Sequence, residues 1–174
     1  MIAEAQTRMA AEAAEAPDRI ALQGAALAEP LGRLAEWWEA SPPRAIVTCA
    51  RGSSDHAALF GKYALELATG RPVASIGPSI VSVYDTALQY EGLLYLTVSQ
   101  SGQSPDLLRS ARAAKAGGAL VVAIVNDPAS PLASAADFDY VIFNEADRVE
   151  DTVDQICAVV VAERCRTVQN EVHL

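Results

Sequence analysis

A run of hydroxyl and small side chains stands between an apolar segment and a helical pattern. It reads Ser99-Gln100-Ser101-Gly102-Gln103-Ser104. Ser104 suits the N-cap position of the following helix, and Pro105 suits its first residue. A helix start presents unpaired backbone N–H groups and partial positive charge, and serine hydroxyls add donors that rotate to suit a tetrahedral anion. The run therefore predicts a phosphate site that requires no cationic side chain.

The same serines could also do no more than cap a helix and form a surface turn. The helix contribution alone is worth about 0.3–1 kcal/mol, so useful affinity needs several charge-assisted hydrogen bonds acting together. The run is neither of the glycine-rich nucleotide loops, because it lacks a Lys-Ser/Thr ending and no Gly-x-Gly-x-x-Gly follows the first expected strand. Nucleotide binding is disfavoured accordingly.

A second polar loop follows an earlier apolar run and reads Arg51-Gly52-Ser53-Ser54-Asp55-His56. Its amides and hydroxyls could meet a sugar ring or its phosphate from the opposite side of a crevice. Ser53 or Ser54 is equally a plain N-cap. Arg51 could neutralise ligand charge or pair with a surface carboxylate. A third loop, residues 125–131, is polar and stiffened by proline but is weakly informative by itself.

Short apolar runs that alternate with helical stretches predict the framework for these loops. Helices are expected at about 54–69, 79–87, 104–116 and 149–168, with a partial turn near 131–136. The expected strands are Ala45–Ala50, Pro72–Ile76, Leu93–Val98, Ala119–Val125 and Asp139–Phe143. This alternation is typical of an α/β fold with a three-layer, doubly wound, five-stranded parallel sheet of the flavodoxin-like type. Ligands then bind beyond the carboxyl ends of the strands, where the polar loops stand.

Two helices, at about 3–15 and 18–39, are expected before the first strand, because this region is rich in Ala, Glu and Leu. We divide the chain into an N-terminal helical segment, residues 1–40, packed on a domain formed by residues 41–174. The helix over 18–39 has a broad apolar surface. Such a helix favours contacts on more than one side, and a homo-oligomer, most simply a dimer, is expected.

Composition excludes several classes of function. The 174 residues are 51% hydrophobic, enough for one substantial core, and the net charge of -9 disfavours nucleic acid. No run of about 18 apolar residues and no secretion signal is found, so neither a membrane span nor export is expected and the protein should be cytoplasmic. Cys49, Cys157 and Cys165 have no metal-type spacing, which predicts reduced core thiols. We expect neither a metal nor a cofactor.

Four ordered motifs resemble the sugar isomerase (SIS) domain family, which includes the isomerase half of glucosamine-6-phosphate synthase and related aminosugar-phosphate deaminases and isomerases. The motifs are residues 50–66, 78–84 and 99–106, together with Asn126-Asp127 and Ser130-Pro131-Leu132-Ala133. The chain resembles the first isomerase domain of such enzymes. The resemblance covers roughly residues 8–136. The family's Gly-x-Glu-x-x-Val-Ala-x-Thr-Lys segment and a second such domain are not found.

The resemblance implies a hexose or hexosamine 6-phosphate as ligand. Ser99, Gln100, Ser101 and Ser104, with Gly102 and Gln103 between them, would hold the phosphate, and Gly52, Ser53 and Ser54 would line the pocket. It also implies proton transfer between C1 and C2 of the open-chain sugar through an enediol or enediolamine, as in an aldose–ketose isomerase or an aminosugar-phosphate deaminase.

Such chemistry needs a base. Glu66 is one candidate, although a solvated helix face would also explain it. His173 is another, because the chain ending faintly resembles phosphoheptose isomerases that share sites between subunits, although a frayed end would explain it equally. The alternative to an enzyme is a non-catalytic sugar-phosphate-binding regulatory or dimerisation module.

Overall fold

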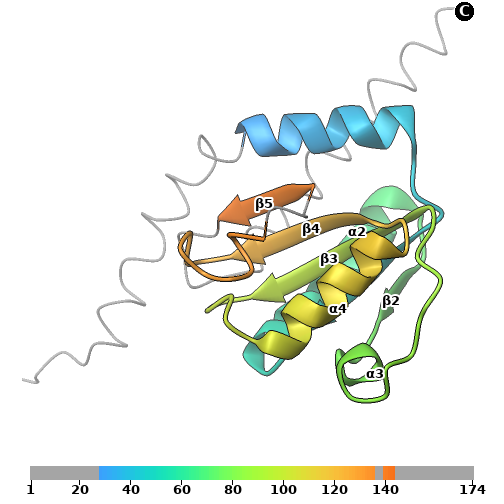
Figure 1. Ribbon diagram of the computed structural model, residues 1–174. Coiled ribbons are helices and arrows are strands. Elements are labelled where there is room, and N and C mark those ends of the chain that lie inside the picture. Colours follow the sequence, from blue (N-terminus) through green and yellow to red (C-terminus); the bar gives the residue numbers. More distant parts are fainter. Residues whose placement is uncertain (1–27, 136–138, 144–174) are drawn as a thin grey trace, which may run out of the picture.

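A computed structural model describes residues 28–135 and 139–143 of the chain, and it contains a parallel sheet with the strand order β2-β1-β3-β4-β5 (Figure 1). This order is the flavodoxin-like one, which confirms the predicted fold class. The strands lie where the apolar runs predicted them, within one or two residues at their ends. Their bounds are β1 Ala45–Ala50, β2 Val73–Ser75, β3 Leu93–Ser99, β4 Leu120–Val125 and β5 Tyr140–Phe143.

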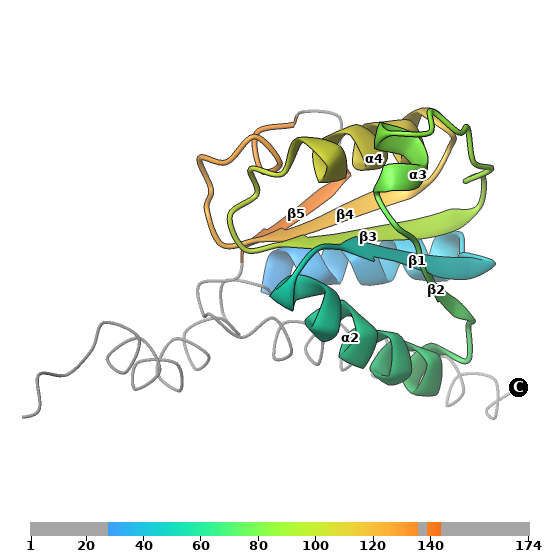
Figure 2. The same ribbon diagram turned by 90° about the horizontal axis from the view of Figure 1, so that it is seen from below.

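Helices cover both faces of the sheet, so the described part of the chain has three layers (Figure 2). The helix of residues 28–40 and α2 (Ser53–Thr69) lie on one face, and α3 (Ser79–Ser82) and α4 (Pro105–Ala116) lie on the other. The helix predicted over 79–87 is wrong in length: it ends at Ser82, and Asp85 takes the left-handed φ of 51°. The predicted helix over 3–15, the beginning of the one over 18–39 and the one over 149–168 fall outside the described residues.

The core has two apolar halves, one on each side of the sheet. On the α2 side, Leu31 and Leu34 of the N-terminal helix pack with Leu65 of α2 against strand residues such as Ile46 and Leu96. Apolar runs such as Val121–Val125 of β4 are buried, as expected for a strand that is covered on both faces.

The half on the α4 side contains polar side chains as well as apolar ones. Tyr95 packs here with Leu107 of α4, and its hydroxyl is 2.8 Å from the Ser110 hydroxyl. Cys49 is buried as a free thiol, and burial raises its pKa, so it is a core thiol as predicted. Cys157 and Cys165 fall outside the described residues.

The order in which the chain adds strands to the sheet reverses between β1 and β3. From β1 the chain passes through α2 to β2 on one side, and from β3 it passes through α4 to β4 on the other. Because α2 and α4 lie on opposite faces, the loops that leave β1 and β3 part from each other at the carboxyl edge of the sheet. This is the topological switch point, where ligands bind in open parallel sheets.

Candidate functional site

The loop between β3 and α4 contains the predicted run of serines, and we call residues 99–104 the serine loop. The Gly102 N–H donates to the Ser99 hydroxyl oxygen at 3.1 Å, and the Gln103 N–H donates to the Ser101 hydroxyl oxygen at 3.4 Å. Each of these oxygens therefore acts as an acceptor for the loop's own backbone. A serine hydroxyl has one hydrogen to donate besides the lone pairs that accept, so both side chains retain a donor for an anion.

The start of α4 decides between the two interpretations of Ser104. This residue is the N-cap, with extended backbone angles, but its side chain makes no capping hydrogen bond, and Pro105 follows in the first turn. Its carbonyl accepts the Leu108 N–H at 3.1 Å. The hydroxyl is thus not used to close the helix. Pro105 has no N–H and the Leu107 N–H donates to Oδ1 of Asp106 at 3.0 Å, so the Asp106 N–H is the first-turn amide that keeps its anion-binding character.

Gly102 fixes the shape of the serine loop through a close approach to the loop after β4. Its φ is +60°, and a Cβ atom added here would lie 2.2 Å from Oγ of Ser130, which is 1% exposed. The Leu132 N–H donates to the Gly102 carbonyl at 3.1 Å, and the Asn126 N–H donates to the Gln100 carbonyl at 3.2 Å. The loop after β4, which the sequence left weakly informative, thus braces the serine loop by packing and by two backbone hydrogen bonds.

The loop after β1 lies next to the serine loop because β1 and β3 are paired, with Ala50 opposite Val98. Gly52 is the N-cap of α2 at φ 59°, and no side chain caps that helix. Ser53 is exposed, whereas Ser54 is 9% exposed. The structure therefore brings Gly52, Ser53 and Ser54 to the same edge as residues 99–104, as the sequence predicted.

An ion pair joins these two loops directly. Nε of Arg51, which follows β1, pairs with Oδ2 of Asp106 in the first turn of α4. Of the two roles that the sequence left open for Arg51, the structure thus shows the pairing with a carboxylate. Sequence reasoning did not select Asp106, although an acidic residue in a first helical turn beside a predicted phosphate loop is a visible signal.

Glu66 lies at the opposite edge of the sheet. Its Oε1 atom accepts hydrogen bonds from Lys62 Nζ at 2.7 Å and from the Val73 N–H at 3.0 Å. These two bonds, the one from Lys62 foremost, lower the pKa of the carboxyl group. The carboxylate thus ties the end of α2 to the beginning of β2. His173, the other candidate base, falls outside the described residues.

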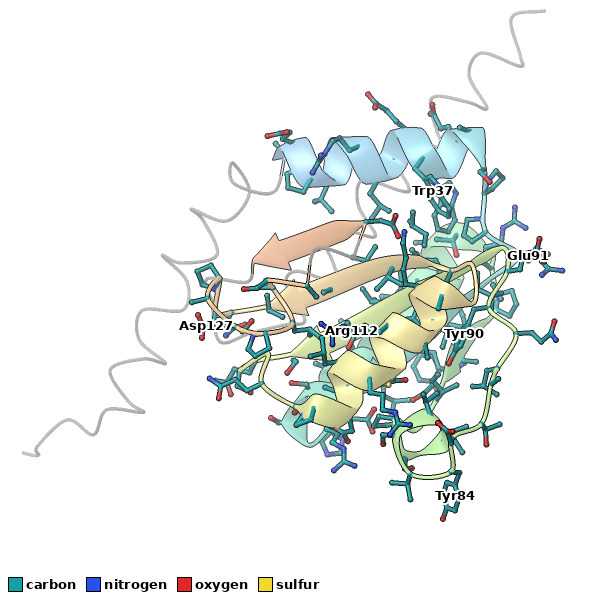
Figure 3. The ribbon with its side chains drawn as sticks, viewed as in Figure 1. Trp37, Tyr84, Tyr90, Glu91, Arg112 and Asp127 are labelled. Carbon is teal, nitrogen blue, oxygen red and sulfur yellow. The ribbon has the colours of Figure 1, made fainter. Side chains whose placement is uncertain are left out.

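Two further titratable groups lie at the carboxyl edge. His56 is exposed in the first turn of α2. Asp127 follows β4, and its Oδ1 atom accepts the Ala129 N–H at 2.8 Å; Figure 3 shows it at the edge opposite Trp37 and Glu91. Residues 28–135 and 139–143 hold no cluster of three or more acidic, histidine or cysteine side chains suited to a metal ion. The same ranges contain no helix with the length and apolar character of a membrane span.

Comparison with known proteins identifies the family of this chain. The SIS domain family matches residues 41–162. Two curated relatives are both glutamine–fructose-6-phosphate aminotransferases (isomerizing). The one from Symbiobacterium thermophilum is 35% identical over 102 residues, and the one from Zymomonas mobilis is 37% identical over 92 residues. These matches cover 54% and 53% of this chain but 15% of each relative, so the chain corresponds to a small part of their length.

Solved structures agree with the fold. A candidate phosphosugar isomerase from Silicibacter pomeroyi is 38% identical with a TM-score of 0.81, over 90% of this chain and 50% of that one. The C-terminal domain of glucosamine-fructose-6-phosphate aminotransferase from Francisella tularensis has a TM-score of 0.76 at 22% identity, over 94% and 49%. The Vibrio vulnificus NanR protein, solved with ManNAc-6P, has a TM-score of 0.67 at 18% identity, over 97% and 66%.

Proposed function

The chain belongs to the SIS domain family, and from that premise we propose that it binds a hexose or hexosamine 6-phosphate at the carboxyl edge of its sheet. The phosphate is held by Ser99, Gln100, Ser101 and Ser104 together with the amides of the serine loop. The sugar lies toward residues 52–54. The observation that carries the proposal is the serine loop itself, whose hydroxyl oxygens accept from its own amides while their hydrogens remain as donors.

The charge of the ligand supports this assignment. A phosphate dianion gains from the partial positive charge of the α4 start and from several charge-assisted hydrogen bonds acting together. Phosphate held far from the reacting carbons also positions them. The names of the relatives agree on this class of ligand, since they include fructose 6-phosphate, and two solved neighbours carry ManNAc-6P and A5P.

Calorimetry tests the binding step. The full chain is titrated with glucosamine 6-phosphate, with glucosamine and with inorganic phosphate. Saturable heat is expected with the sugar phosphate and weaker heat with inorganic phosphate, which competes for the same site. Glucosamine, which differs only in lacking the phosphate, is expected to give none. Equal affinity for glucosamine 6-phosphate and glucosamine contradicts the proposal. So does the absence of heat with glucosamine 6-phosphate and also with fructose 6-phosphate and sedoheptulose 7-phosphate.

We further propose that the bound sugar phosphate reacts, as in an aldose–ketose isomerase or an aminosugar-phosphate deaminase. A base moves a proton between C1 and C2 through an enediol or enediolamine, and remote phosphate binding holds the two carbons against it. His56, in the first turn of α2 two residues after Ser54, is one candidate base, and His173 stays a second candidate. NMR in deuterated water is expected to show exchange of the C2 proton of glucosamine 6-phosphate, or of a C1 proton of fructose 6-phosphate or sedoheptulose 7-phosphate.

A non-catalytic sugar-phosphate sensor is the second candidate function. It is favoured by the position of Glu66, whose engaged carboxylate lies at the other edge of the sheet. Saturable calorimetric binding without any proton exchange would select the sensor over the enzyme.

We also propose that the protein is a homodimer and is located in the cytoplasm. In the described part of the chain, α2 turns apolar side chains to solvent on one face, with Phe60 48%, Tyr63 63% and Leu67 85% exposed. Exposed apolar stripes of this kind mark surfaces that are covered by a partner. Equilibrium sedimentation at micromolar concentration is expected to give twice the mass of the chain, and a clean monomer would contradict the dimer.

A further inference from the structure

The Arg51 and Asp106 pair joins the two loops between which the sugar phosphate is proposed to bind. Arg51 comes directly after β1, and Asp106 stands in the first turn of the helix that leaves β3. β1 and β3 are the two strands at the switch point of the sheet. The pair therefore bridges the two sides of the proposed site, and the anion bound there by Arg51 is the carboxylate of Asp106.

The position of Asp106 is favourable only until a phosphate arrives. A carboxylate in the first turn is stabilised by the helix dipole, and the Leu107 N–H donates to Oδ1 of Asp106 at 3.0 Å. A phosphate held by the serine loop would use the same positive end of α4. Two anions at one helix start repel each other and compete for the cation beside them, and a phosphate dianion attracts that cation more strongly than a single carboxylate does.

The pair is built so that it can exchange. Oδ2 of Asp106 is buried and, among the described residues, has no aligned hydrogen bond, so Arg51 holds it by charge alone. The Arg51 side chain is 57% exposed, whereas that of Asp106 is 19% exposed. The guanidinium group contacts Asp106 through Nε, and its two terminal nitrogens form the fork that matches phosphate oxygens. The residue after Arg51 is Gly52, whose φ of 59° is a left-handed backbone conformation that favours glycine.

We propose that Arg51 exchanges Asp106 for the phosphate of the ligand, so that Asp106 occupies the guanidinium group until a dianion replaces it. The inference rests on the proposed function, because it presupposes a phosphate at the serine loop. It adds a cationic partner to a cradle that otherwise consists of hydroxyls and amides. It also makes Asp106 an internal competitor of the ligand.

Calorimetry with glucosamine 6-phosphate on four forms of the full chain tests the exchange: wild type, Arg51→Gln, Asp106→Asn and the double variant. Arg51→Gln is expected to weaken binding about tenfold, because it removes a charge-assisted phosphate contact. Asp106→Asn is expected to tighten binding by about three- to tenfold, because Arg51 is then free of its competitor. In the double variant the affinity is expected to exceed that of Arg51→Gln by clearly less than Asp106→Asn tightens the wild type, since only the repulsion is relieved and no cation remains to be released.

A second ion pair, between α4 and the loop after α3, supplies the control. Nη2 of Arg109 is 2.7 Å from Oδ1 of Asp85, with side-chain exposures of 55% and 84%. Arg109→Gln and Asp85→Asn change the net charge as the test variants do, and both are expected to alter the affinity less than twofold. Thermal unfolding of every variant separates weaker binding from lost folding.

The outcomes distinguish the exchange from the proposed function. If Asp106→Asn tightens binding equally with and without Arg51, the carboxylate acts by simple repulsion and the exchange is wrong. Unchanged affinity in Arg51→Gln, or weaker binding in a folded Asp106→Asn variant, also overturns it. If the wild type binds no sugar phosphate, it is the proposed function that fails.

Discussion

The two edges of the parallel sheet are both rich in polar groups, but they use them differently. At the amino edge, charged side chains are tied to the framework: Lys115 pairs with Asp139, whose Oδ2 atom also accepts the Val121 N–H at 2.8 Å. The Arg44 side chain there donates to the Glu91 carbonyl. At the carboxyl edge, Ser99 and Ser101 accept from their own loop and keep a hydrogen to give. The first arrangement holds the fold together, whereas the second can hold a ligand.

The comparison also shows that a hollow by itself is weaker evidence than the chemistry of the groups beside it. Grooves of about 340 and 320 Å³ lie at the amino edge, and Trp37, Ser41 and Gly92 line both. Their size suits a small ligand, yet Arg44, Lys115 and Asp139 around them are engaged by the protein itself. The carboxyl edge combines amides at a helix start with hydroxyl donors, which is the chemistry that an anion requires.

The largest effect is expected from Ser101→Glu, because it removes a phosphate donor and adds a negative charge at the helix start. A hydrogen bond to a charged group is worth about 1.5–3 kcal/mol, so the loss of the donor alone weakens binding about tenfold to a hundredfold. Repulsion by the new carboxylate adds to this. Calorimetry with glucosamine 6-phosphate measures it.

Ser41→Glu is the matched control at the amino edge, where Ser41 is exposed beside Trp37. It is expected to leave the affinity unchanged. Comparable weakening by both substitutions would mean that net charge, and not the serine loop, governs binding.

Gly102→Ala is expected to have the next largest effect. A left-handed φ costs an alanine about 1–2 kcal/mol. The new Cβ also meets Ser130 at 2.2 Å, so either the serine loop or its brace must move. We expect a lower unfolding temperature together with at least about tenfold weaker sugar-phosphate binding, by the conversion of about 1.4 kcal/mol per tenfold.

Gly118→Ala controls for the backbone strain. Gly118 has φ +88° at the amino edge, but a Cβ there meets Glu91 at an ordinary 3.6 Å. This variant should lose about 1–2 kcal/mol of stability and no affinity. If the two alanine variants lose affinity equally, the close approach to Ser130 does not shape the site.

Asp139→Asn tests the role of the amino edge. It removes the charge that pairs with Lys115 and weakens the acceptor for the Val121 N–H. A loss of about 1 kcal/mol in the free energy of unfolding is expected, since the group is only partly buried. Chemical denaturation should show this loss while calorimetry shows unchanged binding. A loss of affinity without a loss of stability would assign function to the amino edge.

The smallest effect is expected from Glu66→Gln and concerns the stability of the protein at acidic pH. Its pKa is lowered by Lys62 and the Val73 N–H, so it stabilises the fold fully above its ordinary value of 4.5. That stabilisation is lost as the pH falls through the lowered pKa. Glu66→Gln should flatten the decline in stability below pH 4.5 and leave the proposed proton exchange intact. Abolished proton exchange in a folded Glu66→Gln variant would restore Glu66 as the base.

The elements and loops that apolar periodicity and turn residues specify were predictable from the sequence. The run Leu120–Val125 is apolar enough to require cover on both faces, and Ser104-Pro105 marks the start of α4 within one residue. The length of α3 was not predictable, because Asp85 turns the chain at a positive φ that its local sequence does not require.

Partnerships between distant residues were also beyond the sequence. That Ser130 fills the space beside Gly102, and that Arg51 reaches Asp106, follows from the pairing of β3 with β4 and of β1 with β3. Glu66 shows the converse: helical spacing places it on α2 but does not reveal that the helix carries it to the other edge of the sheet.

The most direct test is a crystal structure of the chain soaked with glucosamine 6-phosphate. The account predicts phosphate density within hydrogen-bonding distance of the Ser99, Ser101 and Ser104 hydroxyls and of the Asp106 amide, with the sugar directed toward residues 52–54. Density in the groove beside Trp37, or a serine loop whose hydroxyls point away from a common centre, would contradict it.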